Sequence, residues 1–309
     1  MSNFNEYRMI GIDIGGTNFR IGAVSRDGDI EDFRKIPVRE VFATSDPLSD
    51  LGAYLQDYID MQNKKNIGIA GVSIGFPATL DRDRKTVLQA PNISFMENLP
   101  VVEVLGKKLQ IPVYIERDVT IALYYDIRKF HIPDCQIISG IYFGTGIGNA
   151  LFINGHPLAG KNGAAGELGH IPVDGSDVVC GCGNVGCMES LAGGKYLAEL
   201  CEKIYAETPI GDIFSRQGSD KLLIQFIDRM AIAVATEINI LDPDYVLIGG
   251  GVPSMKDFPQ DLLTERVLFH TRKPYPADAL DIIYTGDRPE KCVIGAALYG
   301  FSCCKEPTL

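Results

Sequence analysis

The fold is decided by the stretch Met9-Ile-Gly-Ile-Asp-Ile-Gly-Gly-Thr17 and by the segment that follows it, Asn18-Phe-Arg-Ile-Gly-Ala-Val24. β-Branched residues on both sides of a glycine turn predict two antiparallel strands, and Asp27-Gly28 predicts a turn into a third. The same pattern recurs in Gln136-Ile-Ile-Ser-Gly-Ile-Tyr-Phe143, Gly144-Thr-Gly146 and Ile147-Gly-Asn-Ala-Leu-Phe-Ile153. Two such hairpins, about 130 residues apart, indicate a duplicated unit and not a solenoid of short repeats, although any two hairpins resemble each other to some degree.

Strands and helices alternate along the rest of the chain. Continuous apolar runs predict buried strands over residues 67–74, 112–116 and 245–248. Apolar residues at spacings of three and four predict one helix over residues 48–61 and a longer one whose buried face runs from Leu223 to Leu241. This alternation predicts an α/β fold with mixed sheets, and a length of 309 residues suggests two domains.

The composition indicates a globular protein with an acidic surface. Hydrophobic residues make up 46% of the chain, charged residues make up 22%, and the formal net charge is -11. Because an acidic surface repels polyanions, neither nucleic acid nor an acidic membrane is an expected partner. No charged start followed by an apolar run opens the chain, and no run approaches the roughly 18 apolar residues of a membrane span. The expected location is therefore the cytoplasm.

Three glycine turns follow apolar strands and are candidates for holding phosphate, since glycine lets backbone N–H groups approach an anion without a Cβ in the way. The turns contain Asp13, Gly15, Gly16 and Thr17; Gly144, Thr145 and Gly146; and Gly249, Gly250 and Gly251. Asp13 could hold Mg²⁺, because a hard cation prefers carboxylate oxygens. Each turn taken alone is more simply an ordinary hairpin, and neither the P-loop nor the dinucleotide fingerprint occurs in the chain.

One histidine and three cysteines form the most specific pattern. Gly166-Glu-Leu-Gly-His170 is followed by Cys180-Gly-Cys182-Gly-Asn-Val-Gly-Cys187-Met-Glu189. One imidazole and three thiolates suit a tetrahedral Zn²⁺ in a closed structural site, and the glycines at 181, 183 and 186 would let the backbone wrap tightly around it. The alternative is that the three cysteines are simply buried. The sequence therefore predicts a structural zinc with His170, Cys180, Cys182 and Cys187 as its ligands.

This segment resembles the zinc segment of the ROK family, which is named for repressors, open reading frames and kinases. The resemblance extends from Asp13-Ile-Gly-Gly-Thr17 to the final helix at Val293-Ile-Gly-Ala-Ala-Leu298. It implies a two-lobed, actin-like (ribonuclease H-like duplicated) sugar kinase fold. One lobe would span residues 1–117 and be completed by a helix over 292–309, and the other would span 118–291 and carry the zinc loop. The resemblance also implies that the glycine turns hold ATP with Mg²⁺, that a hexose is the second substrate, and that the protein is a homodimer.

The resemblance assigns the transfer step to Asp118. Phosphoryl transfer to a sugar hydroxyl benefits from a carboxylate that takes the hydroxyl proton. From the residues alone, Asp118 is the N-cap of a helix over 119–130, whereas the resemblance makes it the catalytic base. The sugar-contacting residues implied by the same resemblance are Asn92, Glu167, His170 and Glu189. His170 would bind zinc through one ring nitrogen and face the sugar with the other.

Two departures from the common family pattern bear on the substrate. Many members read Glu-Asn-Asp where this chain has Glu116-Arg117-Asp118, and Gly-x-Pro-Gly where it has Gly75-Phe-Pro-Ala78. Both resemble the D-allose kinase branch, which implies conversion of D-allose to D-allose 6-phosphate with Arg117 among the substrate-binding residues. Alternatively, Arg117 points to solvent, and the enzyme is a glucokinase, a fructokinase or an N-acetylmannosamine kinase.

A regulator is the alternative from outside the enzymes. Repressors of the family carry a winged helix before the first glycine turn, and Asp13 leaves no room for one in this sequence. The non-enzyme alternative is therefore a sugar-binding regulator without a DNA-binding domain.

Overall fold

The structure is a computed structural model that describes residues 6–133 and 136–304. The chain divides into two compact units. The first comprises Met1–Ile132, Ala159–Ala164 and Arg288–Leu309, and the second comprises Pro133–Leu158 and Ala165–Asp287.

This division differs from the predicted boundary after Arg117. Helix α4 (Asp118–Lys129) packs against α10 (Lys291–Cys303), so it belongs to the first unit and not to the second. Helix α10 lies in the first unit, where the prediction also put it. Residues 305–309, which the prediction included in that helix, lie outside the described residues.

The first unit is built on a five-stranded mixed sheet in the order β3-β2-β1-β4-β7. Its strands are β1 (Glu6–Ile14), β2 (Asn18–Val24), β3 (Ile30–Pro37), β4 (Ile67–Phe76) and β7 (Val113–Arg117). The first three are antiparallel neighbours, and β4 and β7 run parallel to β1. The predicted glycine hairpin is thus confirmed, with Asp13 directly opposite Arg20.

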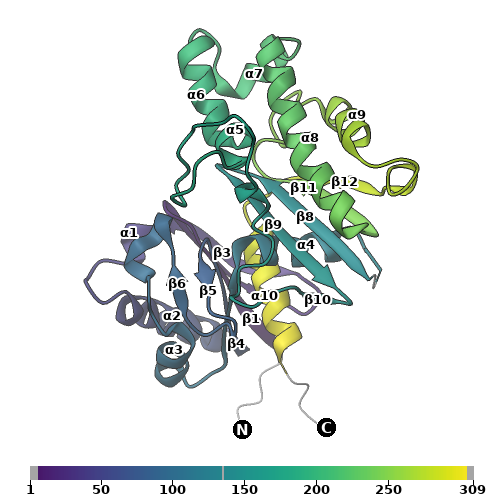
Figure 1. Cartoon of the computed structure of the whole chain (residues 1–309). Coiled ribbons are helices and arrows are strands. Elements are labelled where there is room, and N and C mark those ends of the chain that lie inside the picture. The colour runs from purple at the N-terminus through teal and green to yellow at the C-terminus, as the bar shows by residue number, and fades with distance from the viewer. Residues whose placement is uncertain (1–5, 134–135, 305–309) are drawn as a thin grey trace. The chain divides into compact units, whose positions relative to one another are not determined.

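Helices cover both faces of this sheet (Figure 1). The helical and minor elements are α1 (Val38–Val41), α2 (Pro47–Lys64), η1 (Pro91–Met96), α3 (Val101–Leu109), α4 and α10, with a small hairpin of β5 (Thr79–Leu80) and β6 (Val87–Gln89). Ile10 and Ile12 of β1 pack with Leu51 of α2, whereas Met9 points to the other face and packs with Val293 of α10. This division follows from the two-residue period of a strand.

The second unit repeats the same sheet in the order β10-β9-β8-β11-β12. Its strands are β8 (Ile137–Phe143), β9 (Ile147–Ile153), β10 (His156–Pro157), β11 (Tyr245–Gly249) and β12 (Ile282–Tyr284). Here too an antiparallel hairpin is extended by two parallel strands. The shared strand order confirms the predicted duplication.

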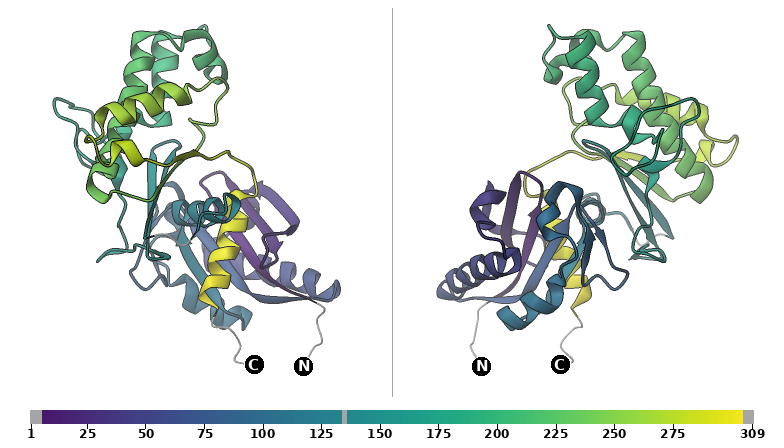
Figure 2. Two further views of the ribbon diagram at one scale, coloured as in Figure 1. Left: turned by 90° about the vertical axis from the view of Figure 1, so that its right-hand side faces the viewer. Right: turned by 60° about the vertical axis from the view of Figure 1, so that its left-hand side comes forward.

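Helix α8 is the main helix of the second unit, and it lies beside α9 (Figure 2). The helical elements are η2 (Leu168–His170), α5 (Glu189–Ala192), α6 (Gly194–Ile204), η3 (Ile210–Asp212), α7 (Ile213–Gln217), α8 (Lys221–Leu241), α9 (Gln260–His270) and η4 (Ala277–Ala279). The predicted apolar face of α8 is buried from Leu223 to Ile238, while Leu241 at its end is only half-buried. Among the described residues, no helix is both long and apolar enough for a membrane crossing.

Candidate functional site

The first glycine turn lies between β1 and β2 and exposes its backbone. Gly16 and Thr17 are exposed, while Asp13 at the end of β1 is buried. The Asp13 carboxylate lies 2.5 Å from the guanidinium of Arg20. A Cβ on Gly16 would lie 3.0 Å from the carbonyl oxygen of Asn92, so this predicted sugar contact is adjacent to the turn. Arg20 was not predicted, although hairpin pairing sets it directly opposite Asp13.

Asp118 lies at the junction of β7 and α4. It is the first helical residue, and Arg117 occupies the N-cap position, so the N-cap reading of Asp118 was wrong by one residue. The Asp118 carboxylate accepts a hydrogen bond from the backbone N–H of Val119 at 2.8 Å. The residue keeps part of its surface exposed. Loss of hydration, reinforced by the charge of Asp13, raises the pKa of Asp118 to about 6.

A buried ion pair supports the strand that leads to Asp118. The carboxylate of Glu116, 2% exposed, lies 3.0 Å from the guanidinium of Arg84. Arg84 also donates to the carbonyl oxygens of Asp81 and Gly163, at 3.3 and 3.2 Å. Burial raises the pKa of Glu116, and the charge of Arg84 opposes that shift. No local pattern signals this pair, because its partners lie on separate elements.

The second and third glycine turns meet in the second unit. Strands β8 and β11 pair in parallel, with Tyr142 opposite Gly249. The N–H of Val252 donates to the carbonyl of Phe143 at 2.9 Å. Gly250 has a φ of +97°, and a Cβ on it would lie 2.5 Å from that same carbonyl. Only glycine fits there, so two of the predicted nucleotide turns lie at adjacent strand ends.

The predicted zinc ligands converge. The ligand atoms of His170, Cys180, Cys182 and Cys187 all lie within 4.8 Å of one another. The Sγ atoms of Cys182 and Cys187 are 3.6 Å apart, and Cys180 Sγ is 3.8 Å from His170 Nδ1. Around a tetrahedral zinc with Zn–S bonds of about 2.3 Å, neighbouring sulfurs would be about 3.8 Å apart. The four side chains therefore fit a closed tetrahedral site.

Two of the three glycines in this loop have the conformation that the prediction required. Gly183 and Gly186 have φ values of +93° and +78°, which other residues rarely adopt. Gly181 lacks a positive φ and has open space where a Cβ would point. The expectation that the loop needs glycine at position 181 was therefore wrong, because the positive φ values that close the loop lie at Gly183 and Gly186.

Two carboxylates flank the predicted ligand His170. Its Nδ1 faces Cys180, and its Nε2 lies 3.5 Å from the carboxylate of Glu167. One oxygen of Glu189 lies 3.2 Å from the Cys180 sulfur, and the other lies 3.4 Å from the N–H of Ile147, beside the second glycine turn. The second unit thus brings together Glu167, His170 and Glu189, three of the predicted sugar contacts.

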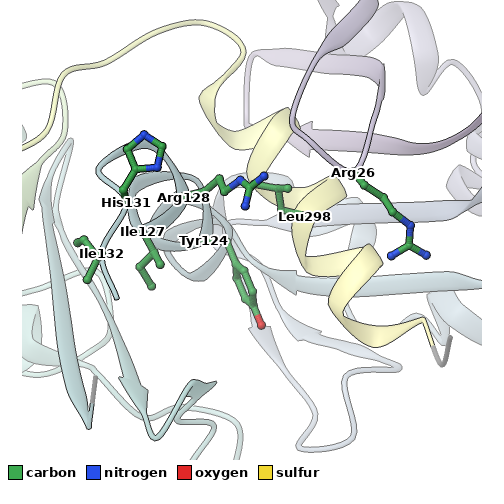
Figure 3. Close-up of a pocket in the computed structure, with 7 residues that line it drawn as sticks. All are labelled: Arg26, Tyr124, Ile127, Arg128, His131, Ile132 and Leu298. Carbon is green, nitrogen blue, oxygen red and sulfur yellow. The ribbon is translucent and has the colours of Figure 1, made fainter. Parts of the chain in front are cut away.

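A separate pocket contains none of the predicted site residues (Figure 3). It has a volume of about 350 Å³ and lies in the first unit, around the C-terminal end of α4. Its lining residues are Arg26, Tyr124, Ile127, Arg128, His131, Ile132 and Leu298. Asp118 starts the same helix at its other end, so this pocket is distinct from the candidate site.

Known proteins share both the sequence pattern and the fold. The sequence profile of the ROK family matches residues 9–300. A glucokinase of Thermotoga maritima is 28% identical to this chain, covering 85% of it and 88% of the relative. An N-acetyl-D-glucosamine kinase of Pectobacterium atrosepticum is also 28% identical, covering 82% of this chain and 87% of the relative.

Two solved structures illustrate the breadth of the match. A ROK hexokinase from Thermus thermophilus has a TM-score of 0.76 at 23% identity, covering 94% of this chain and 97% of that chain. A ROK family transcriptional regulator, a homologue of the E. coli MLC protein, has a TM-score of 0.81 at 23% identity, covering 96% and 78%. These similarities establish the actin-like α/β fold. Because the family profile spans almost the entire chain, from β1 to α10, this protein is a member of the ROK family.

Proposed function

We propose that this protein is an ATP-dependent hexose kinase, and that D-allose is its substrate, converted to D-allose 6-phosphate. The observation that carries the proposal is Asp118, a carboxylate at the start of α4 with a pKa of about 6. A general base is most effective when its pKa lies near the working pH. The kinase names of the two relatives support the same reaction class.

The step that Asp118 would assist balances without another reactant. The oxygen of the sugar hydroxyl forms a bond to the γ-phosphorus of ATP, and the bond from that phosphorus to the β–γ bridging oxygen breaks. ADP leaves with the electron pair of the broken bond, and the hydroxyl proton passes to the Asp118 carboxylate. Little covalent chemistry is left to the protein, so positioning and charge neutralisation supply most of the rate.

Asp13, Gly15, Gly16 and Thr17 would take part in holding ATP together with the second and third turns. Glycine turns present N–H groups to phosphate oxygens. Magnesium bound with ATP would be held near Asp13 and would neutralise phosphate charge. Arg20 pairs with Asp13 and so restricts the orientation of this buried carboxylate.

His170 and the three cysteines would hold a structural zinc, which supplies a crosslink between η2 and the cysteine loop. With all four ligands from protein, the metal has no open position for chemistry. His170 Nε2, Glu167 and Glu189 would then face the sugar hydroxyls. Asn92 and Arg117 remain proposed sugar contacts, and Asp118 remains the proposed base.

Arg117 is the residue on which the choice of D-allose rests. It replaces the asparagine of many members, and a guanidinium only donates hydrogen bonds whereas an amide donates and accepts. D-Allose differs from D-glucose only in the configuration at C3, so we infer that Arg117 donates to the axial 3-hydroxyl. Replacing Arg117→Asn should lower the ratio of allose to glucose turnover, and an unchanged ratio would remove this argument.

The decisive experiment follows ADP release from Mg-ATP with allose, glucose, fructose, N-acetylglucosamine and N-acetylmannosamine. A preference for allose supports the full proposal. A preference for another sugar keeps the kinase and removes the assignment of allose. If zinc-loaded protein binds sugar but turns over none, the chain is a sugar-binding regulator. Sedimentation of the same sample tests the homodimer that the family resemblance implies.

A further inference from the structure

A pair of glycines joins the cysteine loop to the second glycine turn. The N–H of Gly194 donates to the carbonyl of Gly144 at 2.8 Å, and the N–H of Lys195 donates to the carbonyl of Thr145 at 2.9 Å. These two donors begin α6, where N–H groups have no partner within the helix. These two hydrogen bonds hold the second glycine turn, through its carbonyl oxygens, against the start of α6.

This arrangement sets where the N–H groups of the turn point. In a trans peptide the carbonyl and the following N–H are antiparallel. Because the carbonyls of Gly144 and Thr145 point to α6, the N–H groups of Thr145 and Gly146 point away from it. Thr145 is exposed, so this side of the turn is open to a phosphate group.

The same joint is connected to the predicted metal ligands by a continuous set of backbone hydrogen bonds. The N–H of Ser190 donates to the carbonyl of Cys187 at 3.0 Å, and that of Gly193 donates to Glu189 at 2.9 Å. Helix α5 is therefore a single hydrogen-bonded turn between a metal ligand and the joint. The Glu189 side chain adds a second connection, since it reaches both Cys180 and the N–H of Ile147.

The joint tolerates no side chain. A Cβ on Gly193 would lie 2.8 Å from the carbonyl oxygen of Thr145, and a Cβ on Gly194 would lie 2.5 Å from that of Gly144. A Cβ on Gly146 would collide with the Glu189 carboxylate. The contacts of Gly193 and Gly194 are with backbone carbonyl groups, which cannot rotate away as a side chain can, so a displacement of α5 would also displace the turn.

We propose that α5 and the Gly193-Gly194 joint couple the metal cluster to the nucleotide turn, so that metal occupancy sets the affinity for the phosphates of ATP and ADP. The inference rests on the proposed function, because it concerns the nucleotide site of a kinase. Glu189, Gly193 and Gly194 are then positioning residues for the phosphate-binding N–H groups, and the metal acts on nucleotide binding without contacting the nucleotide.

The test uses the full chain loaded with zinc and titrated with Mg-ADP in the absence of sugar. Coupling between two sites is reciprocal. Saturating Mg-ADP should therefore shift the competition of a zinc-selective chelator for the bound metal by about fivefold or more. Gly194→Ala should keep the metal, weaken Mg-ADP binding about tenfold or more and abolish this shift. The matched control is Gly211→Ala, whose Cβ points into open space. It should retain the Mg-ADP affinity and the shift in zinc competition.

Hydrogen–deuterium exchange of residues 143–148 supplies a readout that does not depend on nucleotide. Exchange there should become faster in Gly194→Ala and on removal of zinc, while α8 stays protected. If Mg-ADP leaves zinc competition unchanged and exchange does not respond, the coupling is refuted. If the wild type binds no Mg-ADP, the kinase proposal falls, and the exchange result alone decides for or against the coupling.

Discussion

Glu237 should make the protein lose stability as the pH rises from acid to neutral. This carboxyl lies on α8 and is only 6% exposed. It accepts a hydrogen bond from Ser139 Oγ of β8 and another from Asn149 Nδ2 of β9, the latter at 2.9 Å. Burial, partly opposed by these hydrogen bonds, raises the pKa of Glu237 from 4.5 to about 7.

The direction and the size of this change in stability follow from the difference between the pKa values of Glu237 in the folded and the unfolded chain. Below about pH 4.5 both the folded and the unfolded chain hold the proton, so the stabilisation is fully present. Between that pH and about 7 only the unfolded chain releases it, so stability falls, and above about 7 the loss is complete. A displacement of the pKa from 4.5 to about 7 corresponds to about 3 kcal/mol.

The perturbation is Glu237→Gln, which keeps the shape and an accepting oxygen but cannot ionise. Urea unfolding of both proteins at pH 5 and at pH 8 gives the difference between their unfolding free energies, in which the other titrating groups cancel. The variant should gain up to about 3 kcal/mol over the wild type between these two pH values. The matched control is Glu202→Gln, at an exposed position on α6, which should gain nothing. If wild type and Glu237→Gln lose stability equally between pH 5 and pH 8, Glu237 is not the source of the pH dependence.

Three further predictions concern the site and its support. Asp118→Asn should lower kcat about 100-fold or more, while a titration shows unchanged affinity for Mg-ADP. The wild-type rate should fall below a pH of about 6, where Asp118 becomes protonated. Full turnover by the variant would exclude Asp118 as the base. Cys187→Ser should lose stoichiometric zinc by elemental analysis, whereas retention of the metal would contradict the ligand set. Lys291→Met should cost about 3–5 kcal/mol in urea unfolding, because it removes the ammonium group that lies 2.6 Å from the buried Asp126 carboxylate. Adding Asp126→Leu should recover most of that loss, and a failure to recover would point to a role beyond the pair.

Much of the candidate site could be predicted because its parts are local in sequence. The four predicted metal ligands lie within a short segment, and their residue types and spacing indicate the chemistry before any folding is considered. The glycine hairpins are local for the same reason, and both were found where the apolar strands end. Gly181 shows the limit of this reasoning, since its residue type is right but its backbone does not need glycine.

Partners that are distant in the chain could not be predicted. Arg84 and Glu116 pair across separate elements, and Glu237 meets Ser139 and Asn149 only when α8 covers the sheet. In the sequence each of these is one polar residue among many. Its contribution to stability depends on how deeply it is buried and on its hydrogen-bond partners, and both are set by tertiary packing.

The two hairpins, the family and the convergence of His170 with the three cysteines could be predicted from the sequence alone, because short spacings restrict backbone geometry and ligand chemistry. Three features could be read only from the packed chain: α4 belongs to the first unit, the pKa of Asp118 is raised, and the N–H groups of Gly194 and Lys195 donate to the carbonyls of the second turn. These features arise when distant segments exclude water and approach within hydrogen-bond distance. The free energy of these contacts depends on the whole packed structure and cannot be assigned to any single stretch of sequence.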